Sequence, residues 1–192
     1  NRNTMTAAFV TEFYLSTHLK PKEMGEANEL GLKRFEEAKR LKMRDRIGKD
    51  DLFSHQRGAR CERAVRKALG VPHDPNHFNV FGRGERQAAP DVPPDIEVRH
   101  ASFVNGDLMG KVKPADQETS KRLVVVYEHN SEHYILGWIP IADALRVAHR
   151  HDPGNRNVPA LWVPSEHLIS KQRERAEDLQ YEKDEREGMK LF

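Results

Sequence analysis

The sequence predicts an α/β fold, in which helices and strands occur along a single chain of 192 residues. Two helices are expected first. Residues 21–48 begin at a proline, and residues 51–70 contain an apolar stripe at helical spacing that ends at a glycine. Residues 122–128 form a continuous apolar run, which is typical of a central strand buried on both faces. A chain of this length suits one domain with extensions.

Shorter segments complete the expected secondary structure. Further strands are predicted at residues 76–82, 96–103, 108–112, 133–139 and 159–164. Asn105 and Gly106 indicate a tight hairpin turn between two of these strands. Pro140 indicates a helix that continues to about His149, and Ser165 is a candidate cap for a C-terminal helix. Residues 171–187 are almost wholly charged, which favours an exposed helix or a tail.

Composition narrows the class of protein. Hydrophobic residues make up 37% of the chain and charged residues 32%, and the net charge of +2 does not by itself indicate a nucleic-acid partner. One cysteine, Cys61, excludes an intrachain disulfide and fits a reducing compartment. We find no signal peptide, membrane-spanning run or glycine-rich nucleotide motif. We therefore expect a soluble cytoplasmic protein without a membrane partner.

The stretch from Pro90 to Arg99 carries the main candidate site. Strand side chains alternate between faces, so Glu97 and Arg99 should share one face, with Asp91 at the preceding turn. Mg²⁺ prefers oxygen ligands, so Asp91 and Glu97 could bind it while Arg99 stabilises charge on a phosphate. The same residues also fit an ordinary turn followed by an edge strand with a solvated charge pair.

Basic residues flank this stretch. Between Arg57 and Arg86 the chain has seven basic and three acidic residues, a local surplus of four positive charges. A surface that binds nucleic-acid phosphates should be basic, so this surplus supports a nucleic-acid partner without specifying one. The candidate contacts are Arg57, Arg60, Arg83 and Arg86.

In this order, the elements resemble the PD-(D/E)XK nuclease superfamily, whose fold is called restriction-endonuclease-like. The resemblance lies in Gly58-Ala-Arg-Cys-Glu62, in Pro90-Asp91 and in Glu97-Val-Arg99, and later segments resemble small phage and bacterial nuclease-like proteins. It implies an αβββαβ core with a mixed central sheet and extra N- and C-terminal helices. The implied divisions are a helical extension at residues 1–50, a nuclease domain at 51–168 and a charged helix or tail at 169–192.

The resemblance also implies a function, namely hydrolysis of DNA phosphodiester bonds with Mg²⁺ or Mn²⁺. Asp91 and Glu97 would bind the metal, Glu62 would orient a metal-bound water or hold a second ion, and Arg99 would contact the scissile phosphate. Many nucleases of this fold are dimers, so a homodimer stays open.

The chain departs from the family pattern at two points, because Arg99 stands where the family has lysine and residues 104–121 show no clear helix. Asp95 also rivals Asp91 as the first carboxylate, but Asp91 is preferred because the family separates this aspartate from the next strand by a turn. The alternative is therefore a catalytically degenerate protein of the same fold that binds nucleic acid or serves as an assembly module. A wholly structural domain whose charged termini bind a protein is more distant.

Overall fold

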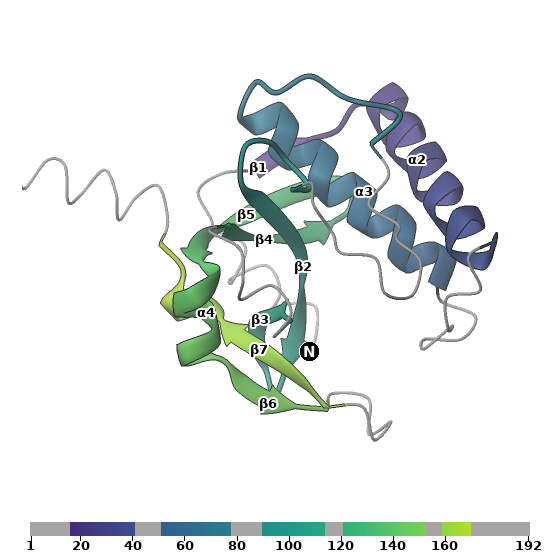
Figure 1. Ribbon diagram of the computed structural model, residues 1–192. Helices are drawn as coiled ribbons and strands as arrows, with labels where there is room; N and C mark the ends of the chain where they lie inside the picture. Colours follow the sequence, from purple (N-terminus) through teal and green to yellow (C-terminus); the bar gives the residue numbers. More distant parts are fainter. Residues whose placement is uncertain (1–15, 41–50, 78–89, 114–120, 153–158, 170–192) are drawn as a thin grey trace, which may run out of the picture.

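The structure is a computed structural model that describes residues 16–40, 51–77, 90–113, 121–152 and 159–169. In these ranges the chain has an α/β fold with three α-helices and a seven-stranded mixed sheet (Figure 1). The elements in chain order are β1 (Ser16–His18), α2 (Pro21–Arg40), α3 (Asp51–Ala68), β2 (Ile96–Val104), β3 (Asp107–Val112), β4 (Arg122–His129), β5 (Glu132–Pro140), α4 (Ile141–Val147), β6 (His149–His151), β7 (Ala160–Pro164) and the 3₁₀ turn η3 (Ser165–His167).

The sheet has the strand order β1-β5-β4-β2-β3-β7-β6. β2 and β4 are parallel, and the other neighbouring strands are antiparallel. The prediction that β4 is a central strand is confirmed, because it pairs on both sides and Leu123 to Val126 are buried. Its continuous apolar sequence reflects this burial on both faces.

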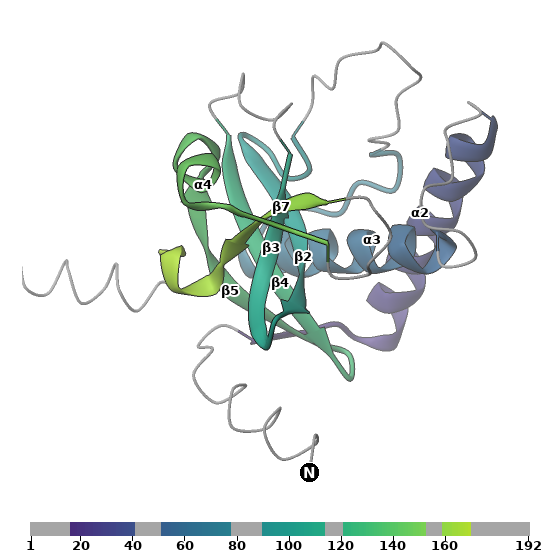
Figure 2. The same cartoon turned by 90° about the horizontal axis from the view of Figure 1, so that it is seen from below.

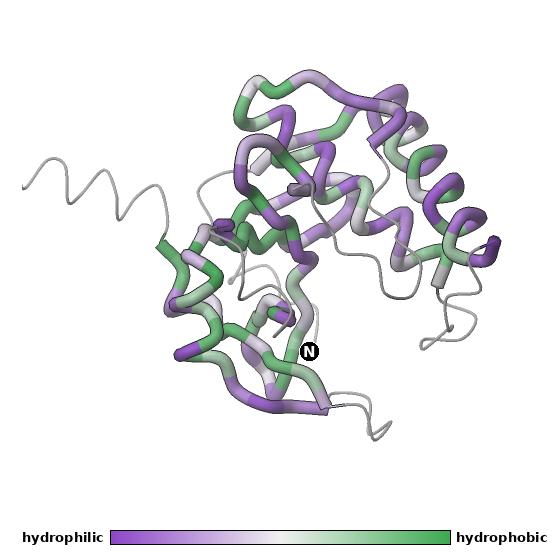
Figure 3. Tube along the Cα trace, viewed as in Figure 1, coloured by the Kyte–Doolittle hydropathy of each residue, from purple (hydrophilic) through white to green (hydrophobic). Residues whose placement is uncertain are grey.

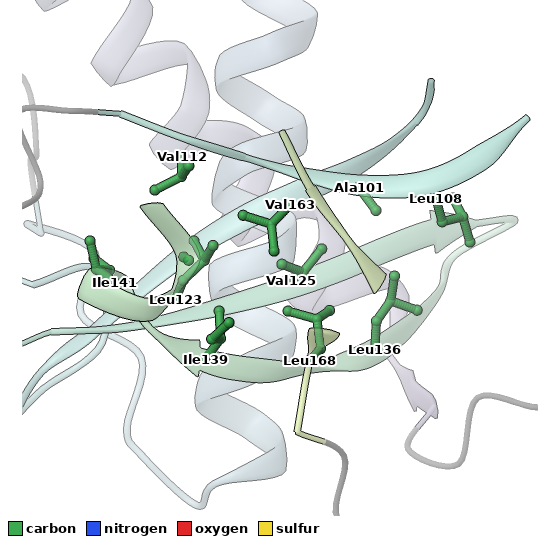
Figure 4. Packing of buried hydrophobic residues seen from close by; sticks show 11 residues of the cluster. Ala101, Leu108, Val112, Leu123, Val125, Leu136, Ile139, Ile141, Val163 and Leu168 are labelled. Carbon is green, nitrogen blue, oxygen red and sulfur yellow. The ribbon is translucent and has the colours of Figure 1, made fainter. Parts of the chain in front are cut away.

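Helices cover the two faces of the sheet, with α2 and α3 on one side and α4 on the other (Figures 1 and 2). Cys61 and Val65 of α3 pack in a core cluster with even-numbered residues of β2 such as Val98. A second cluster joins β2, β3, β4, β5 and β7 to α4 and to Leu168, the residue after η3, as Figure 4 shows. The alternation of β2 therefore places Glu97 and Arg99 on the face opposite α3.

α2 packs along α3 through its apolar stripe. Its buried residues are spaced at about one helical turn, and Figure 3 shows hydrophilic and hydrophobic residues alternating along the helix. A Cβ atom at Gly31 would lie 2.5 Å from the Cα of Gln56, so glycine permits the close approach of the two helices. No helix among the described residues is long and apolar enough to cross a membrane. The division of the chain at residues 50 and 168 stays a prediction, although α2 joins the same fold as α3.

Most predicted elements are confirmed with small shifts of their ends. The helix predicted at 21–48 is present to Arg40, and residues 41–50 lie outside the described part. Asn105 and Gly106 both have positive φ, 53° and 94°, as the predicted hairpin turn requires. Val104 then pairs with Asp107 at the start of β3.

Four predictions differ from the structure or fall outside its described part. The helix predicted from Pro140 to about His149 ends at Val147, because His149–His151 form β6 and pair with β7. Ser165 begins a single 3₁₀ turn instead of a longer helix, and the charged residues 171–187 lie outside the described residues. In the strand predicted at 76–82, Asn76 lies in a turn, and residues 78–82 are not described.

Gly137 provides a test of the packing between β5 and η3. Its φ is +146°, and a Cβ atom there would lie 2.5 Å from the carbonyl oxygen of Ile169. We expect Gly137→Ala to lower the free energy of unfolding by about 2–4 kcal/mol, measured by urea denaturation, through backbone strain and overpacking. The control is Gly58→Ala in α3, where the added Cβ meets no atom within 4 Å. That substitution should raise stability by about 0.5–1 kcal/mol, and an equal response of both variants would contradict the proposed clash.

Candidate active site

Asp91 lies against the edge of β2 that faces away from β4. Val92 and Ile96 exchange two backbone hydrogen bonds of 3.0 and 2.9 Å, which fold residues 91–96 back on themselves. The N–H of Val98 then donates to Oδ2 of Asp91 at 2.8 Å. The carboxylate thus replaces a neighbouring strand as the partner of this N–H group and is held beside the start of β2.

Two basic side chains contact these carboxylates, Arg99 from β2 itself and Lys121, the residue before β4. Nη1 of Arg99 lies 3.3 Å from Oδ2 of Asp91 and 3.3 Å from Oε2 of Glu97. Nζ of Lys121 lies 2.5 Å from Oε1 of Glu97. The structure therefore brings together three residues that the sequence singles out, Asp91, Glu97 and Arg99, and adds Lys121.

Lys121 was missed because the sequence has no local motif that links it to Glu97. The parallel pairing of β2 with β4 places Ile96 opposite Arg122, which brings Lys121 beside the carboxylate 24 residues away. Two features of the sequence could have indicated Lys121. It directly precedes the most strongly apolar strand, and the Glu-x-Arg motif lacks the lysine that the family it resembles has at that position.

Asp91 and Asp95, the two candidates for the first metal-binding carboxylate, have different partners in the structure. Asp95 forms a bidentate salt bridge with Arg122, at 2.8 and 3.0 Å. Asp91 instead shares a guanidinium nitrogen with Glu97. The geometry therefore favours Asp91 as the carboxylate that acts together with Glu97.

Burial raises the electrostatic cost of holding two ionised carboxylates in this cluster. Glu97 is 1% exposed, and its pKa is raised above the ordinary value of 4.5 by burial and by the charge of Asp91. The hydrogen bond from Lys121 and the charge of Arg99 oppose this rise. Two carboxylates close together in a poorly solvated place require compensating positive charge, which here comes from the two basic side chains.

Glu62 lies on α3 and is bound by Arg34 of α2. Nη1 and Nη2 of Arg34 donate to the two carboxylate oxygens at 2.7 and 2.6 Å, and Nη2 also donates to the carbonyl of His77 at 3.0 Å. Burial and the nearby Asp91 raise the pKa of Glu62 to about 7, although Arg34 opposes the rise. Arg34 was not foreseen from the sequence, because nothing local relates it to a glutamate 28 residues away.

The donor set can be tested against the predicted Mg²⁺ or Mn²⁺. Asp91 and Glu97 fit, because both are carboxylates and both approach the same cationic nitrogen of Arg99. Both oxygens of Glu62 are bound by Arg34, and those of Glu97 contact Lys121 and Arg99, so a metal ion at either carboxylate would replace one of these contacts. Within the described ranges no group of three His, Cys, Asp or Glu side chains is placed to hold a metal ion. Water and substrate oxygens would have to complete the coordination of Mg²⁺.

The residues predicted to contact nucleic acid have different surroundings. Arg83 and Arg86 lie outside the described residues. Arg60 is 6% exposed and donates to Glu128 at 2.8 and 2.7 Å and to Asn28 at 2.8 Å, which favours a structural role. Arg57 lies over the ring of the exposed Phe53, 4.3 Å from its centroid. Contact of these arginines with nucleic acid stays a prediction.

Glu128 is the centre of a second buried polar cluster. It accepts hydrogen bonds from Arg60 and, at 3.0 Å, from Nε2 of the fully buried His133. Burial would raise the pKa of Glu128, but these hydrogen bonds outweigh it and hold the pKa at about 2. On β2, burial and the charge of Arg57 lower the pKa of His100 to about 4.

The low pKa of Glu128 predicts a particular acid dependence of stability. The pKa falls from its ordinary value of 4.5 to about 2 in the fold. Its stabilising contribution is therefore fully present above pH 4.5 and is lost as the pH falls through about 2. Glu128→Gln should lower the free energy of unfolding above pH 4.5, and the difference from the unsubstituted protein should shrink at lower pH. A difference that stays constant in urea denaturation down to pH 2 would contradict this assignment.

Comparisons with known proteins do not assign a family. No protein-family model, no curated protein and no solved structure matches this chain. Function is therefore inferred from the chemistry and geometry of the cluster formed by Asp91, Glu97, Arg99 and Lys121.

Proposed function

We propose that this protein is a metal-dependent nuclease that hydrolyses DNA phosphodiester bonds, on a restriction-endonuclease-like fold. One observation carries the proposal. Asp91 and Glu97 approach the same nitrogen of Arg99, while Lys121 contacts Glu97 from the neighbouring strand. Two carboxylates for a hard cation and two basic groups for a phosphate are the components that such a reaction needs.

The arrangement of elements supports this proposal in part. α3 precedes the strand that carries Glu97 and Arg99, and that strand pairs with a parallel neighbour, β4. Residues 105–112 form the β2–β3 turn and β3, so they do not contribute the helix of the implied αβββαβ order. The likeness to the restriction-endonuclease-like fold thus lies more in the residues of the site than in the order of the elements.

Each side chain has a distinct proposed role. Asp91 and Glu97 would hold the metal, and the N–H of Val98 keeps Asp91 in position. When bound, Mg²⁺ would lower the pKa of a water molecule and neutralise charge on the phosphate. Arg99 and Lys121 would donate hydrogen bonds to the phosphate oxygens, and Arg99 cannot serve as a base because its guanidinium stays protonated.

The first test is a cleavage assay on supercoiled plasmid and linear duplex DNA with Mg²⁺, with Mn²⁺ and with EDTA. We expect cleavage with either metal and none with EDTA. Nicked or linear plasmid would indicate endonuclease action, whereas shortening of linear DNA from its ends would indicate exonuclease action. Cleavage that persists in EDTA, or DNA that stays intact with both metals, would overturn the proposal.

A second candidate is a catalytically degenerate protein of the same fold that binds nucleic acid. The favouring observation is that Asp91, Glu97 and Glu62 each already have a basic partner. A binder would retain DNA in an electrophoretic mobility assay, with affinity that falls as salt increases, and would not cut it with any metal. The cleavage assay therefore separates the two candidates.

A further inference from the structure

A row of basic and aromatic side chains crosses the end of the sheet formed by β3, β7 and β6. Lys111 of β3 is paired with Trp162 of β7, and Trp162 is paired with His149 of β6. Side chains of directly paired residues lie on the same face of a sheet. Lys111 and His149 are exposed and Trp162 is partly exposed, so the row is accessible to solvent.

This row lies on the same face of the sheet as α3. In β3, Leu108 and Val112 point into the core cluster with α4, so Lys111 between them points to the other face. Figure 2 shows α3 beside β2 and β4, while β3 and β7 extend beyond β2 on its other side. The face carrying the row therefore continues outward from the part of the sheet that α3 covers.

The charge on this face is mainly positive. Lys113 is exposed two residues after Lys111, directly beyond the end of β3. Where α3 meets β2, burial and the positive charge of the nearby Arg57 lower the pKa of His100. The acidic residue on this face of β3 is Asp107, four residues from Lys111 and about 13 Å away along the strand.

Aromatic rings accompany the positive charge. The rings of His149 and His151 have centroids 6.2 Å apart, and Nε1 of Trp162 donates to the carbonyl of His151 at 3.3 Å, which fixes the edge of the indole. Trp162 is thus held in a sheet with part of its surface exposed. Two strand spacings, about 10 Å, separate Lys111 from His149.

We propose that the face formed by Lys111, Trp162 and His149 binds a single strand of nucleic acid. Trp162 would stack on an unpaired base, and Lys111 would contact the adjoining phosphates. A sheet surface with aromatic rings suits unpaired bases because a ring can stack on them directly, whereas the bases of a duplex must first be unstacked. This inference rests on the proposed function in that the bound strand would be the substrate.

The surface adjoins the candidate active site through β2. Lys111 follows Gly110, whose partner Ala101 is two residues from Arg99 in β2. Strand alternation places Glu97 on the other face, and Asp91 accepts a hydrogen bond from the N–H of Val98 at the edge of β2. A strand bound on the Lys111 face would therefore reach the carboxylates around this edge, which predicts cleavage of single-stranded or frayed DNA.

The test is fluorescence anisotropy with labelled oligothymidine in EDTA, so that binding is measured without cleavage. We expect Lys111→Glu to weaken binding at least about tenfold, a loss within the range for one stacking or phosphate position, and to reduce the salt dependence by about one ion. The control is Lys22→Glu on α2, which makes the same charge change at a side chain that is 88% exposed. Affinity for the control should stay within about twofold of the unsubstituted protein.

Tryptophan fluorescence provides a second measurement. The chain has two tryptophans, so Trp138→Phe leaves Trp162 as the reporter. We expect saturable quenching by oligothymidine and weaker quenching by a blunt duplex. Unchanged emission of Trp162, equal affinities of the two lysine variants, or a duplex that binds as tightly as oligothymidine would each overturn the inference.

The outcomes also separate this inference from the proposed nuclease function. If oligothymidine binding depends on Lys111 but no metal-dependent cleavage occurs, the result supports the binding surface and overturns the nuclease function. The opposite result is that cleavage is lost on substitution of Glu97 while Lys111→Glu changes neither cleavage nor oligothymidine binding. That result would support the nuclease function and overturn the binding surface.

Discussion

Glu97→Gln is expected to lower metal-dependent DNA cleavage at least about 100-fold, because it removes one of two carboxylates proposed to hold the metal. Glutamine has nearly the same shape, so it should preserve the packing of a side chain that is 1% exposed. The negative charge that faces Lys121 and Arg99 would be lost. The measurement is the initial rate of plasmid nicking at saturating Mg²⁺, with circular dichroism to verify folding.

Asp95→Asn is the matched control for this experiment. Asp95 is an acid of the same stretch, but its carboxylate binds Arg122 and not the cluster around Glu97. We expect Asp95→Asn to change the cleavage rate by less than about fivefold, as for a partly exposed charge outside the site. Asp91→Asn should instead resemble Glu97→Gln. Loss of cleavage in Asp95→Asn with retention in Asp91→Asn would show that Asp95 is the metal ligand.

The largest effect on stability is expected for Arg34→Leu, which should lower the free energy of unfolding by about 3–5 kcal/mol. Arg34 and Glu62 form a bidentate pair whose side chains are 6% and 10% exposed. Removing one partner leaves the other buried without its countercharge, beside Asp91. The measurement is urea denaturation of the full chain at neutral pH.

Two further variants make the interpretation specific. Lys33→Leu removes an exposed pair with Glu29 on the same helix and should change stability little. The double variant Arg34→Leu with Glu62→Leu should regain much of the loss, because two apolar side chains can replace a buried ion pair. If the double variant is as unstable as Arg34→Leu, packing of the arginine and not its charge explains the effect.

Local sequence patterns determined much of the secondary structure. The apolar run of β4, the Asn105–Gly106 hairpin and the stripe of α3 each follow from the conformational preference of a few neighbouring residues. The alternation of β2 likewise placed Glu97 and Arg99 on one face before any tertiary contact was considered. These features depend on periodicity or on a turn, and both are contained in short segments.

Tertiary structure decided what surrounds those side chains. Pairing of β2 with β4 brings Lys121 to Glu97, and packing of α2 on α3 brings Arg34 to Glu62, across separations of 24 and 28 residues. Packing of α3 on the sheet gives Arg60 the partner Glu128 of β4, although the sequence suggested an exposed contact to nucleic acid. α4 ends at Val147 because the next residues pair with β7. The position of each partner is set by how whole elements pack, and no short segment of sequence specifies it.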